Sequence, residues 1–296
     1  MKQPAITVKL VGGLGNQLFI WATAFHLKKL REVEITLDAS ECTMWGDQLS
    51  DFGIQVDIPG PLVPDGRLPS RYSANANFLI RILRKLRNLY RQLHLGNTYW
   101  ENPNKSFDSK IFVTPPGKEL RGYFQSYKYF NDSSEDIREL LSQPSSPSKE
   151  FHDIVANLPT DWLAIHLRLG PDYKIMQAQF GELGRKYFYD AIQHVERIFP
   201  KLPSFVFSDD IDLAKEILPG CSAYIGKRQL FNPVERLLVM SYSRAFIGSN
   251  STFSWWAAFL NRDSNAVKIF PEPWFLDSSV NLEDLIPPDW VLINRS

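Results

Sequence analysis

The sequence predicts an α/β fold made of two halves. With 296 residues, the chain is longer than the roughly 100–200 residues typical of one domain. Its second half alternates short apolar, β-branched runs with segments of helical periodicity, which is typical of βαβ units and a parallel sheet. Strands are expected at 162–168, 204–208, 222–225, 245–248 and 266–270, and helices at 186–198, 211–218, 233–242 and 252–260. A strand, a glycine-rich turn and a helix open the first half, as in many nucleotide-binding folds.

The composition is that of a globular protein and excludes several classes of function. Hydrophobic residues make up 44% of the chain and charged residues 22%, which suffices for a buried core. The 33 basic and 33 acidic residues cancel, so nucleic acid is not an expected partner. Cys42 and Cys221 are too few for a disulfide scaffold or a thiolate metal site. Without a signal-peptide pattern or an apolar run of membrane-spanning length, we expect a cytoplasmic location.

The first half begins with an apolar strand at 6–11, and residues 12–17 (GGLGNQ) are expected to form a turn before a helix. Glycine lets the backbone approach a ligand closely, which makes Gly13 and Gly15 candidate contacts. Asn16 offers a side-chain donor and acceptor at the start of the helix. The alternative is an ordinary tight turn with Asn16 as the helix N-cap.

The polar, proline-broken stretch 142–149 (SQPSSPSK) predicts a boundary between a domain 1–148 and a domain 149–296. Residues 33–75 are rich in turn residues and are expected to be irregular. Residues 78–95 show an amphipathic helical pattern whose polar side carries basic residues and no acidic one. Two interpretations of this pattern stay open: its apolar stripe packs on its own domain, or it makes peripheral contact with an anionic membrane surface.

Three segments of the second half place polar side chains where a strand ends. On the strand 162–168, His166 and Arg168 share one face, because side chains alternate along a strand. Ligands of open parallel sheets bind beyond the carboxyl ends of the strands, and a guanidinium matches two phosphate oxygens. Arg168 is therefore a candidate phosphate contact, and a salt bridge with Asp172 is the alternative.

The second of these segments, Ser249–Thr252, crowds hydroxyl and amide groups at a predicted helix start. Free backbone N–H groups at such a place bind anions, so Asn250, Ser251 and Thr252 are candidate contacts. The alternative is that one of them is an ordinary N-cap.

The third segment is FSDD at 207–210, where Asp209 could bind ribose hydroxyls or a guanine. Asp210 is better explained as a helix cap. We discount the D-x-D spacing of Asp210 and Asp212 as a metal site, because Asp212 is expected inside a helix.

Taken together, these segments resemble the bacterial α-1,2-fucosyltransferases of glycosyltransferase family 11. The similar stretches span nearly the whole chain and comprise GGLGNQLF, RGYFQSYKYF at 121–130, H-x-R at 166–168, FSDD, NSTFSWWAAFL at 250–260 and a closing P-x-x-W/F at 271–275. The family usually carries H-x-R-R-G-D. Here Leu169 replaces the second arginine and Pro171 precedes Asp172, which is more similar to the motif of protein O-fucosyltransferases.

The resemblance implies a GT-B-like fold of two Rossmann-like domains facing a cleft, with domain 1–148 on the acceptor side and domain 149–296 binding a GDP-sugar. It implies inverting transfer of L-fucose from GDP-β-L-fucose, without a metal or other cofactor. The acceptor would be an oligosaccharide or lipid-linked glycan. The fucose would be joined α-1,2 to its terminal galactose. The implied donor contacts are Asn16, His166, Arg168, Asp209, Ser251 and Thr252.

The chemistry suggests roles for two residues. Arg168 would stabilise the charge that grows on the β-phosphate, and Asp172 is the candidate general base. Three alternatives stay open: transfer of another GDP-deoxysugar such as colitose, a non-catalytic nucleotide-binding scaffold, and a dinucleotide-dependent oxidoreductase. The last would need Asp38 to hold a ribose, and the chain lacks G-x-G-x-x-G.

Overall fold

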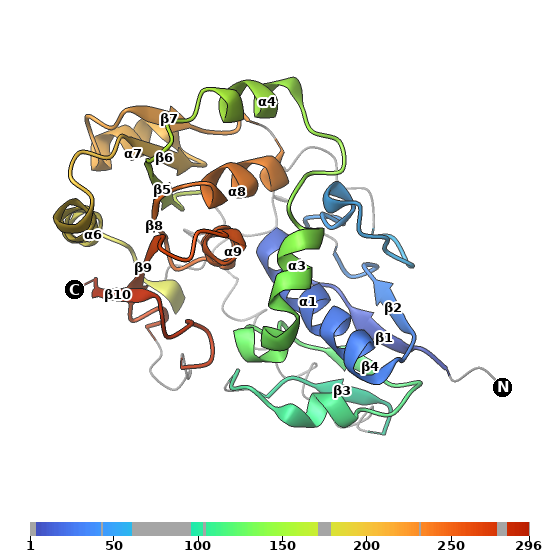
Figure 1. The fold of residues 1–296 in the computed structure, drawn as a ribbon. Coiled ribbons are helices and arrows are strands. Elements are labelled where there is room, and N and C mark those ends of the chain that lie inside the picture. Colours follow the sequence, from blue (N-terminus) through green and yellow to red (C-terminus); the bar gives the residue numbers. More distant parts are fainter. Residues whose placement is uncertain are drawn as a thin grey trace, which may run out of the picture. The chain divides into compact units, whose positions relative to one another are not determined.

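The computed structural model describes residues 4–42, 44–60, 96–102, 105–170, 179–230, 232–276 and 283–295. They form two compact units, which Figure 1 shows in blue to green and in green to red. The first unit comprises Met1–Ser50 and Ile54–Ser133, and the second comprises Asp51–Gly53 and Ser134–Ser296. Each unit contains one parallel sheet, so the predicted α/β class and the two-sheet architecture expected of a GT-B-like chain are confirmed.

The sheet of the first unit has four parallel strands in the order β2-β1-β4-β3. Its strands are β1 (Ile6–Lys9), β2 (Ile35–Asp38), β3 (Thr98–Trp100) and β4 (Glu119–Arg121). Helix α1 (Leu14–Arg31) connects β1 to β2 and is buried on most of its circumference, as expected for a helix rich in apolar residues. Short 3₁₀ helices cover Ser50–Phe52, Ser109–Val113, Tyr127–Tyr129 and Asn131–Ser133.

Two expectations for the first unit were wrong. Helix α1 begins at Leu14 with Gly13 as its N-cap, so residues 14–17 are helical rather than part of a turn. Gly12, at φ +79°, makes the reversal by itself, and the amide of Gln17 already donates to the Gly13 carbonyl at 3.0 Å. Residues 35–38 are a strand because they pair with β1, a non-local contact that the turn-rich composition of 33–75 conceals. The amphipathic segment 78–95 lies outside the described residues.

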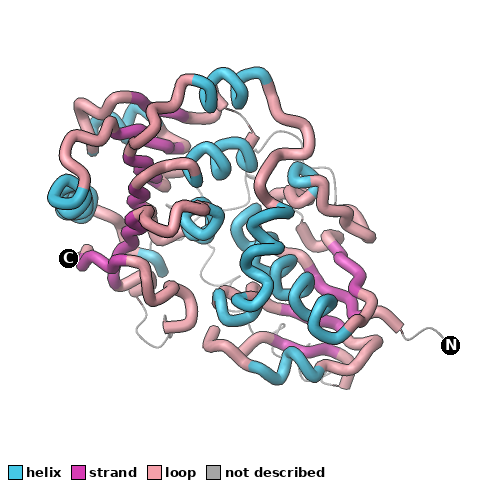
Figure 2. The backbone as a smooth tube through the Cα atoms, viewed as in Figure 1, coloured by secondary structure: helices cyan, strands magenta, loops and turns pink. Residues whose placement is uncertain are grey.

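The sheet of the second unit has six parallel strands in the order β10-β9-β8-β5-β6-β7. The strands are β5 (Leu163–Leu167), β6 (Ser204–Ser208), β7 (Ala223–Ile225), β8 (Ala245–Ile247), β9 (Val267–Glu272) and β10 (Val291–Asn294). The helices are α3 (Ser134–Leu140), α4 (Lys149–Ala156), α6 (Arg185–Ile198), α7 (Ile211–Ile217), α8 (Pro233–Ser241) and α9 (Thr252–Leu260). Helices α6 and α7 cover one face of this sheet, while α8 and α9 pack together on the other (Figure 2).

The two faces of β5 confirm the predicted alternation. Ile165 and Leu167 belong to the core cluster beneath α6 and α7, and Leu169 packs against that cluster. His166 points the other way, to α9. All five predicted strands and four predicted helices of this unit are present, whereas α3, α4 and β10 were not predicted.

The chain passes from the first compact unit to the second between Ser133 and Ser134, before the predicted domain boundary at 148/149. Helix α3 is part of the second unit because Arg138 donates to the carbonyl of Phe259 at 2.8 Å and lies over its ring, 4.5 Å from the centroid. Within the described segments, no helix combines the length and apolar character needed to cross a bilayer.

Candidate active site at the carboxyl edge of the second sheet

Arg168 follows directly after β5, at the carboxyl edge of the second sheet. Its backbone amide donates to the Ser249 hydroxyl at 3.1 Å, and its Nη1 donates to the Ser251 hydroxyl at 3.2 Å. Ser251 is in turn the N-cap of α9. The guanidinium therefore stands beside the N-terminus of a nine-residue helix, where backbone N–H groups and the helix dipole favour an anion.

The three polar residues before α9, Ser249, Asn250 and Ser251, make different contacts. Ser249 donates its hydroxyl to the His166 carbonyl at 2.7 Å and so ties β8 to β5. Ser251 accepts from the amide of Phe253 and caps the helix, as the alternative interpretation expected. Asn250 is fully buried, and its Nδ2 donates to the carbonyls of Phe180 at 2.8 Å and Trp274 at 2.9 Å. Asn250 thus holds loops together, and a direct donor contact for it stays a prediction.

His166 is a neutral imidazole in this site. Its Nδ1 lies 2.6 Å from the Ser254 hydroxyl of α9, and its ring lies 5.4 Å from that of Phe253. Burial, together with the positive charges of Arg168 and Arg236, lowers the pKa of His166 to about 3. At neutral pH the ring can therefore position hydrogen-bonding partners but adds no charge.

The two aspartates after β6 have separate roles. Asp210 caps α7 by accepting from the amide of Leu213 at 3.1 Å, and Asp212 lies inside that helix, so the predicted positions of both residues are confirmed. Asp209 is exposed, and its Oδ1 accepts from the amide of Leu169 at 2.8 Å. This bond holds Asp209 at the same sheet edge as Arg168 and orients its carboxylate there.

Arg236, in α8, belongs to this edge and was not singled out from the sequence. Its Nη1 donates to the Leu230 carbonyl at 2.6 Å. Burial lowers the pKa of Arg236 to about 10, although the carboxylates of Asp209 and Glu235 oppose this shift. The charge of Arg236 also acts on His166, which places both arginines in one electrostatic environment. A single arginine in a helical pattern gives no sequence signal for such a position.

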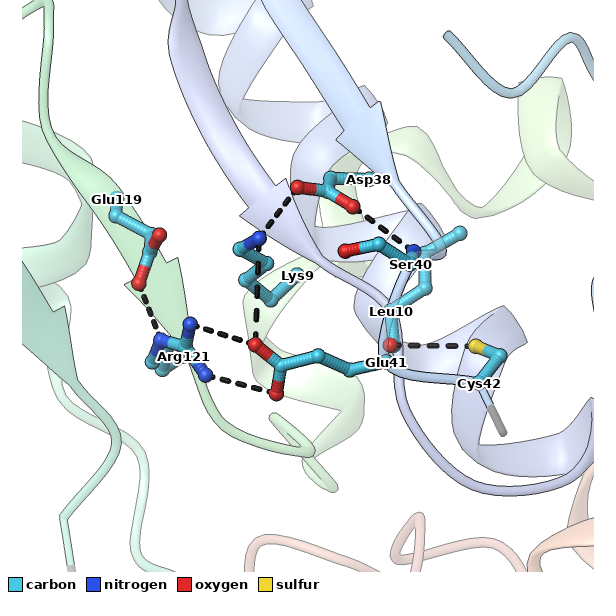
Figure 3. A network of polar contacts seen from close by, with 8 residues as sticks. All are labelled: Lys9, Leu10, Asp38, Ser40, Glu41, Cys42, Glu119 and Arg121. Carbon is cyan, nitrogen blue, oxygen red and sulfur yellow. Dashed lines mark hydrogen bonds and ion pairs between the residues drawn. The ribbon is translucent and has the colours of Figure 1, made fainter. Parts of the chain in front are cut away.

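At the carboxyl edge of the first sheet, charged side chains neutralise one another (Figure 3). Lys9 at the end of β1 forms an ion pair with Asp38 at the end of β2. Arg121 at the end of β4 holds Glu41 through two hydrogen bonds of 2.9 and 2.7 Å, and also pairs with Glu119. Asp38 is 4% exposed, so its carboxylate is committed to this network rather than presented to a ribose.

Asn16 lies near this network in sequence but makes different contacts. It is in the first turn of α1, so the alternative in which it caps the helix is wrong. Its Oδ1 accepts from Nε2 of Gln125 at 2.8 Å, and the Oε1 of Gln125 accepts from Lys105 at 3.2 Å. This links GGLGNQ to the RGYFQSYKYF block, two of the stretches that carry the family resemblance.

Glu101, directly after β3, supports the same block. Its Oε2 accepts from the amide of Tyr123 at 2.8 Å. Burial raises the pKa of Glu101, although the amides that it binds favour the ionised form. A Cβ on Gly122 would lie 2.3 Å from the Cβ of Glu101, so only glycine fits there. No local pattern singles out Glu101, because its role depends on residues 121–123 returning past it in space.

Some predicted features are not decided by this geometry. Asp172, the candidate general base and possible partner of Arg168, lies outside the described residues. Thr252 is the first residue of α9, and Gly13 and Gly15 lie at the start of α1. Among the described residues, no group of three or more histidine, cysteine and acidic side chains could hold a metal ion. Metal independence stays a prediction.

Curated proteins of related sequence are bacterial and animal glycosyltransferases. An α-1,2-colitosyltransferase of Escherichia coli is 26% identical over 98% of this chain and 99% of its own length. An O-antigen biosynthesis glycosyltransferase of Escherichia coli is 24% identical over 95% of this chain and 98% of its own. A galactoside 2-α-L-fucosyltransferase of Caenorhabditis elegans is 24% identical over 59% of this chain and 52% of its own.

A family model adds to these pairwise likenesses. The model described as glycosyl transferase family 11 matches residues 77–294, which include the whole second sheet and the carboxyl edge that carries Arg168. The match confirms the predicted family and excludes the oxidoreductase interpretation. This chain is a glycosyltransferase that belongs to glycosyltransferase family 11.

Proposed function

We propose that this glycosyltransferase moves L-fucose from GDP-β-L-fucose to a hydroxyl of a glycan acceptor, α-1,2 to a terminal galactose. The observation that carries the proposal is the hydrogen bond between Arg168, at the end of β5, and Ser251, the N-cap of α9. It fixes a permanent cation beside a helix N-terminus, an arrangement that suits a diphosphate leaving group. Asp209 lies at the same edge, where its carboxylate would bind the ribose hydroxyls or the guanine of the nucleoside.

The proposed reaction is a single displacement. The acceptor oxygen attacks C1 of the sugar, and the bond from C1 to the β-phosphate oxygen breaks, so the anomeric configuration inverts. The bonding electrons leave with GDP, and Arg168 with the N-terminal amides of α9 stabilises the growing negative charge. A general base takes the acceptor proton, a role for which Asp172 is our candidate. Arg168 and the helix N-terminus supply the charge stabilisation that a divalent cation supplies in other transferases.

Transfer of colitose from its GDP-linked form is the second candidate. It is favoured by the 26% identity, over nearly the whole chain, to an α-1,2-colitosyltransferase. The phosphate chemistry is the same for both donors, so Arg168 does not separate them.

A donor screen tests the proposal. Wild-type protein in EDTA is incubated with GDP-fucose, GDP-colitose, GDP-mannose or UDP-galactose and a terminal β-galactoside. We expect the highest kcat/KM with GDP-fucose and no product with UDP-galactose. A 2-deoxygalactoside should not be an acceptor if the linkage is α-1,2. Preference for GDP-colitose would establish the second candidate. Activity that vanishes in EDTA and returns with Mn²⁺ would reject the metal-free mechanism.

A further inference from the structure

Three polar side chains of the first unit form a chain of hydrogen bonds that ends at the start of α1. Lys105 donates from Nζ to Oε1 of Gln125 at 3.2 Å, and Nε2 of Gln125 donates to Oδ1 of Asn16 at 2.8 Å. Gln125 is 9% exposed, so the carboxamide in the middle of this chain is shielded from water. Each of the two bonds therefore depends on the protein group at its other end.

The ammonium of Lys105 decides which way both carboxamides point. The oxygen and nitrogen of an amide have nearly the same shape, so an Asn or Gln side chain can fill one place in two orientations. An ammonium only donates, so Oε1 of Gln125 must face Lys105 and its NH2 group must face Asn16. Asn16 then presents its oxygen to Gln125, and its NH2 group lies at the other end of the amide.

The surroundings hold Lys105 and Gln125 in place. Glu101 is 7% exposed and accepts from the amide of Tyr123, whose ring centroid lies 5.4 Å from the Nζ of Lys105. The carboxylate of Glu101 favours the charged form of Lys105 and opposes the effect of burial, which lowers the pKa of this lysine. Phe124 has a φ of +50°, and its carbonyl closes a three-residue turn with Gln125 at the centre.

The NH2 group of Asn16 lies at the glycine turn that follows β1. A Cβ on Gly12 would meet Nδ2 of Asn16 at 2.5 Å, which places this nitrogen against the backbone of the turn. Glycine lets a ligand approach the backbone closely there. An NH2 group carries two hydrogens, so it can donate to a ligand oxygen in addition to a contact within the protein. This orientation suits a ligand rich in acceptors, such as phosphate or sugar oxygens.

We propose that Lys105 is a positioning residue that, through Gln125, keeps the side chain of Asn16 oriented as a hydrogen-bond donor to the sugar nucleotide. The proposal rests on the proposed function in one respect, that Asn16 contacts the GDP-sugar. With the amide reversed, the oxygen of Asn16 would face the oxygens of that ligand, and an attractive contact would become a repulsive one.

Thermal denaturation without ligand tests the orientation. Asn16→Asp replaces the amide by a group that only accepts, so it keeps the bond from Gln125, and the melting temperature should stay within about 2 °C of wild type. Asn16→Leu leaves the NH2 group of Gln125 without its acceptor, so the melting temperature should fall by several degrees. A lower melting temperature for Asn16→Asp than for Asn16→Leu would mean that Asn16 donates to Gln125, and it would overturn the proposal.

Calorimetry with GDP-fucose tests the consequence for binding. Gln125→Glu offers only oxygens, so Asn16 must reverse its amide to bind it, and we expect Kd to rise roughly ten- to a hundredfold. Asn16→Ala should also raise Kd, and adding Gln125→Glu to it should then have little further effect, because no amide is left to reverse. A full effect of Gln125→Glu in that background would show that its added charge alone weakens binding, which contradicts the proposal.

Lys105 is tested with the same measurement. Lys105→Met removes the group that orients Gln125 and should raise Kd several-fold, whereas Lys105→Arg should keep it near wild type because a guanidinium also only donates. Lys110→Met, a change at an exposed lysine of the same unit, is the control. A wild-type Kd in Lys105→Met or in Asn16→Ala overturns the proposal. If the wild type binds UDP-galactose and not GDP-fucose, the proposed donor fails, and the same variants with UDP-galactose still decide the role of Lys105.

Discussion

Arg121 and Arg236 are both partly buried arginines near the carboxyl edge of a parallel sheet, yet their pKa values shift in opposite directions. Burial lowers both, but at Arg121 the hydrogen bonds that it donates to Glu41 and Glu119 prevail and raise the pKa. At Arg236 burial prevails, and the pKa falls to about 10. The acidic groups around Arg121 therefore outweigh its burial, whereas those around Arg236 do not. The predictions below test this difference.

The largest effect is expected for Arg168→Lys. The ammonium keeps the charge but cannot form the planar fork, so kcat should fall by about 10²–10³-fold, as for loss of one donor in an oxyanion site. The melting temperature should change little. Transfer assays and thermal denaturation check this, with Arg197→Lys on α6 as the control. A near-normal kcat, or a large fall in melting temperature, would show that Arg168 serves the fold as Arg121 does.

The neutral state of His166 predicts a pH dependence of stability. Its pKa is about 3 in the fold against an ordinary value of 6.5, so the folded protein disfavours the protonated ring. Its contribution to stability is complete above pH 6.5. It is lost at up to about 1.4 kcal/mol per pH unit as the pH falls from there toward 3.

Urea denaturation between pH 7 and pH 4 measures this slope. His166→Gln should flatten the dependence, and His152→Gln, an exposed change on α4, should not. Equal slopes in wild type and His166→Gln would mean that the fold does not lower the pKa of the ring.

At the first edge the expected effect is on stability. Gly12 has φ +79°, and a Cβ there would lie 2.5 Å from Nδ2 of Asn16, so Gly12→Ala should cost about 1–3 kcal/mol. Gly13 has an ordinary φ of −80° and a Cβ site 3.8 Å from Trp45, so Gly13→Ala is the matched control. Denaturation of both variants measures the difference. If Gly13→Ala keeps its stability but loses activity, the predicted ligand contact of Gly13 gains support.

The smallest effect is expected for Arg121→Gln. It breaks the ion pairs with Glu41 and Glu119, but Glu41 is 42% exposed, so solvent screening limits the loss to about 1 kcal/mol. GDP affinity should not change. Lys186→Gln, which breaks an exposed pair with Asp190, provides the comparison and should cost less. A loss of GDP affinity in Arg121→Gln without loss of stability would place a ligand at the first edge and remove the contrast between the sheets.

Much of the second unit could be predicted from the sequence because its signals are local. Helix α9 begins and ends where its apolar pattern does, at Thr252 and Leu260, and β6 spans the predicted 204–208. The capping role of Asp210 also follows from neighbouring residues alone. By contrast, β2 and β10 are short strands whose identity comes from pairing with β1 and β9. No local pattern contains that information.

The sequence by itself determined the α/β class, the family, and the position of His166 and Arg168 on one face of β5, because alternation and motif order are properties of a linear chain. Tertiary structure decided the partners and the burial of each charged side chain. It neutralised Lys9 and Arg121 by bringing three strand ends together, and it placed Arg236 where burial outweighs its two acidic neighbours. The reason is physical. The free energy of a charge depends on the dielectric and the partners around it in space, and neither is fixed by its neighbours along the chain.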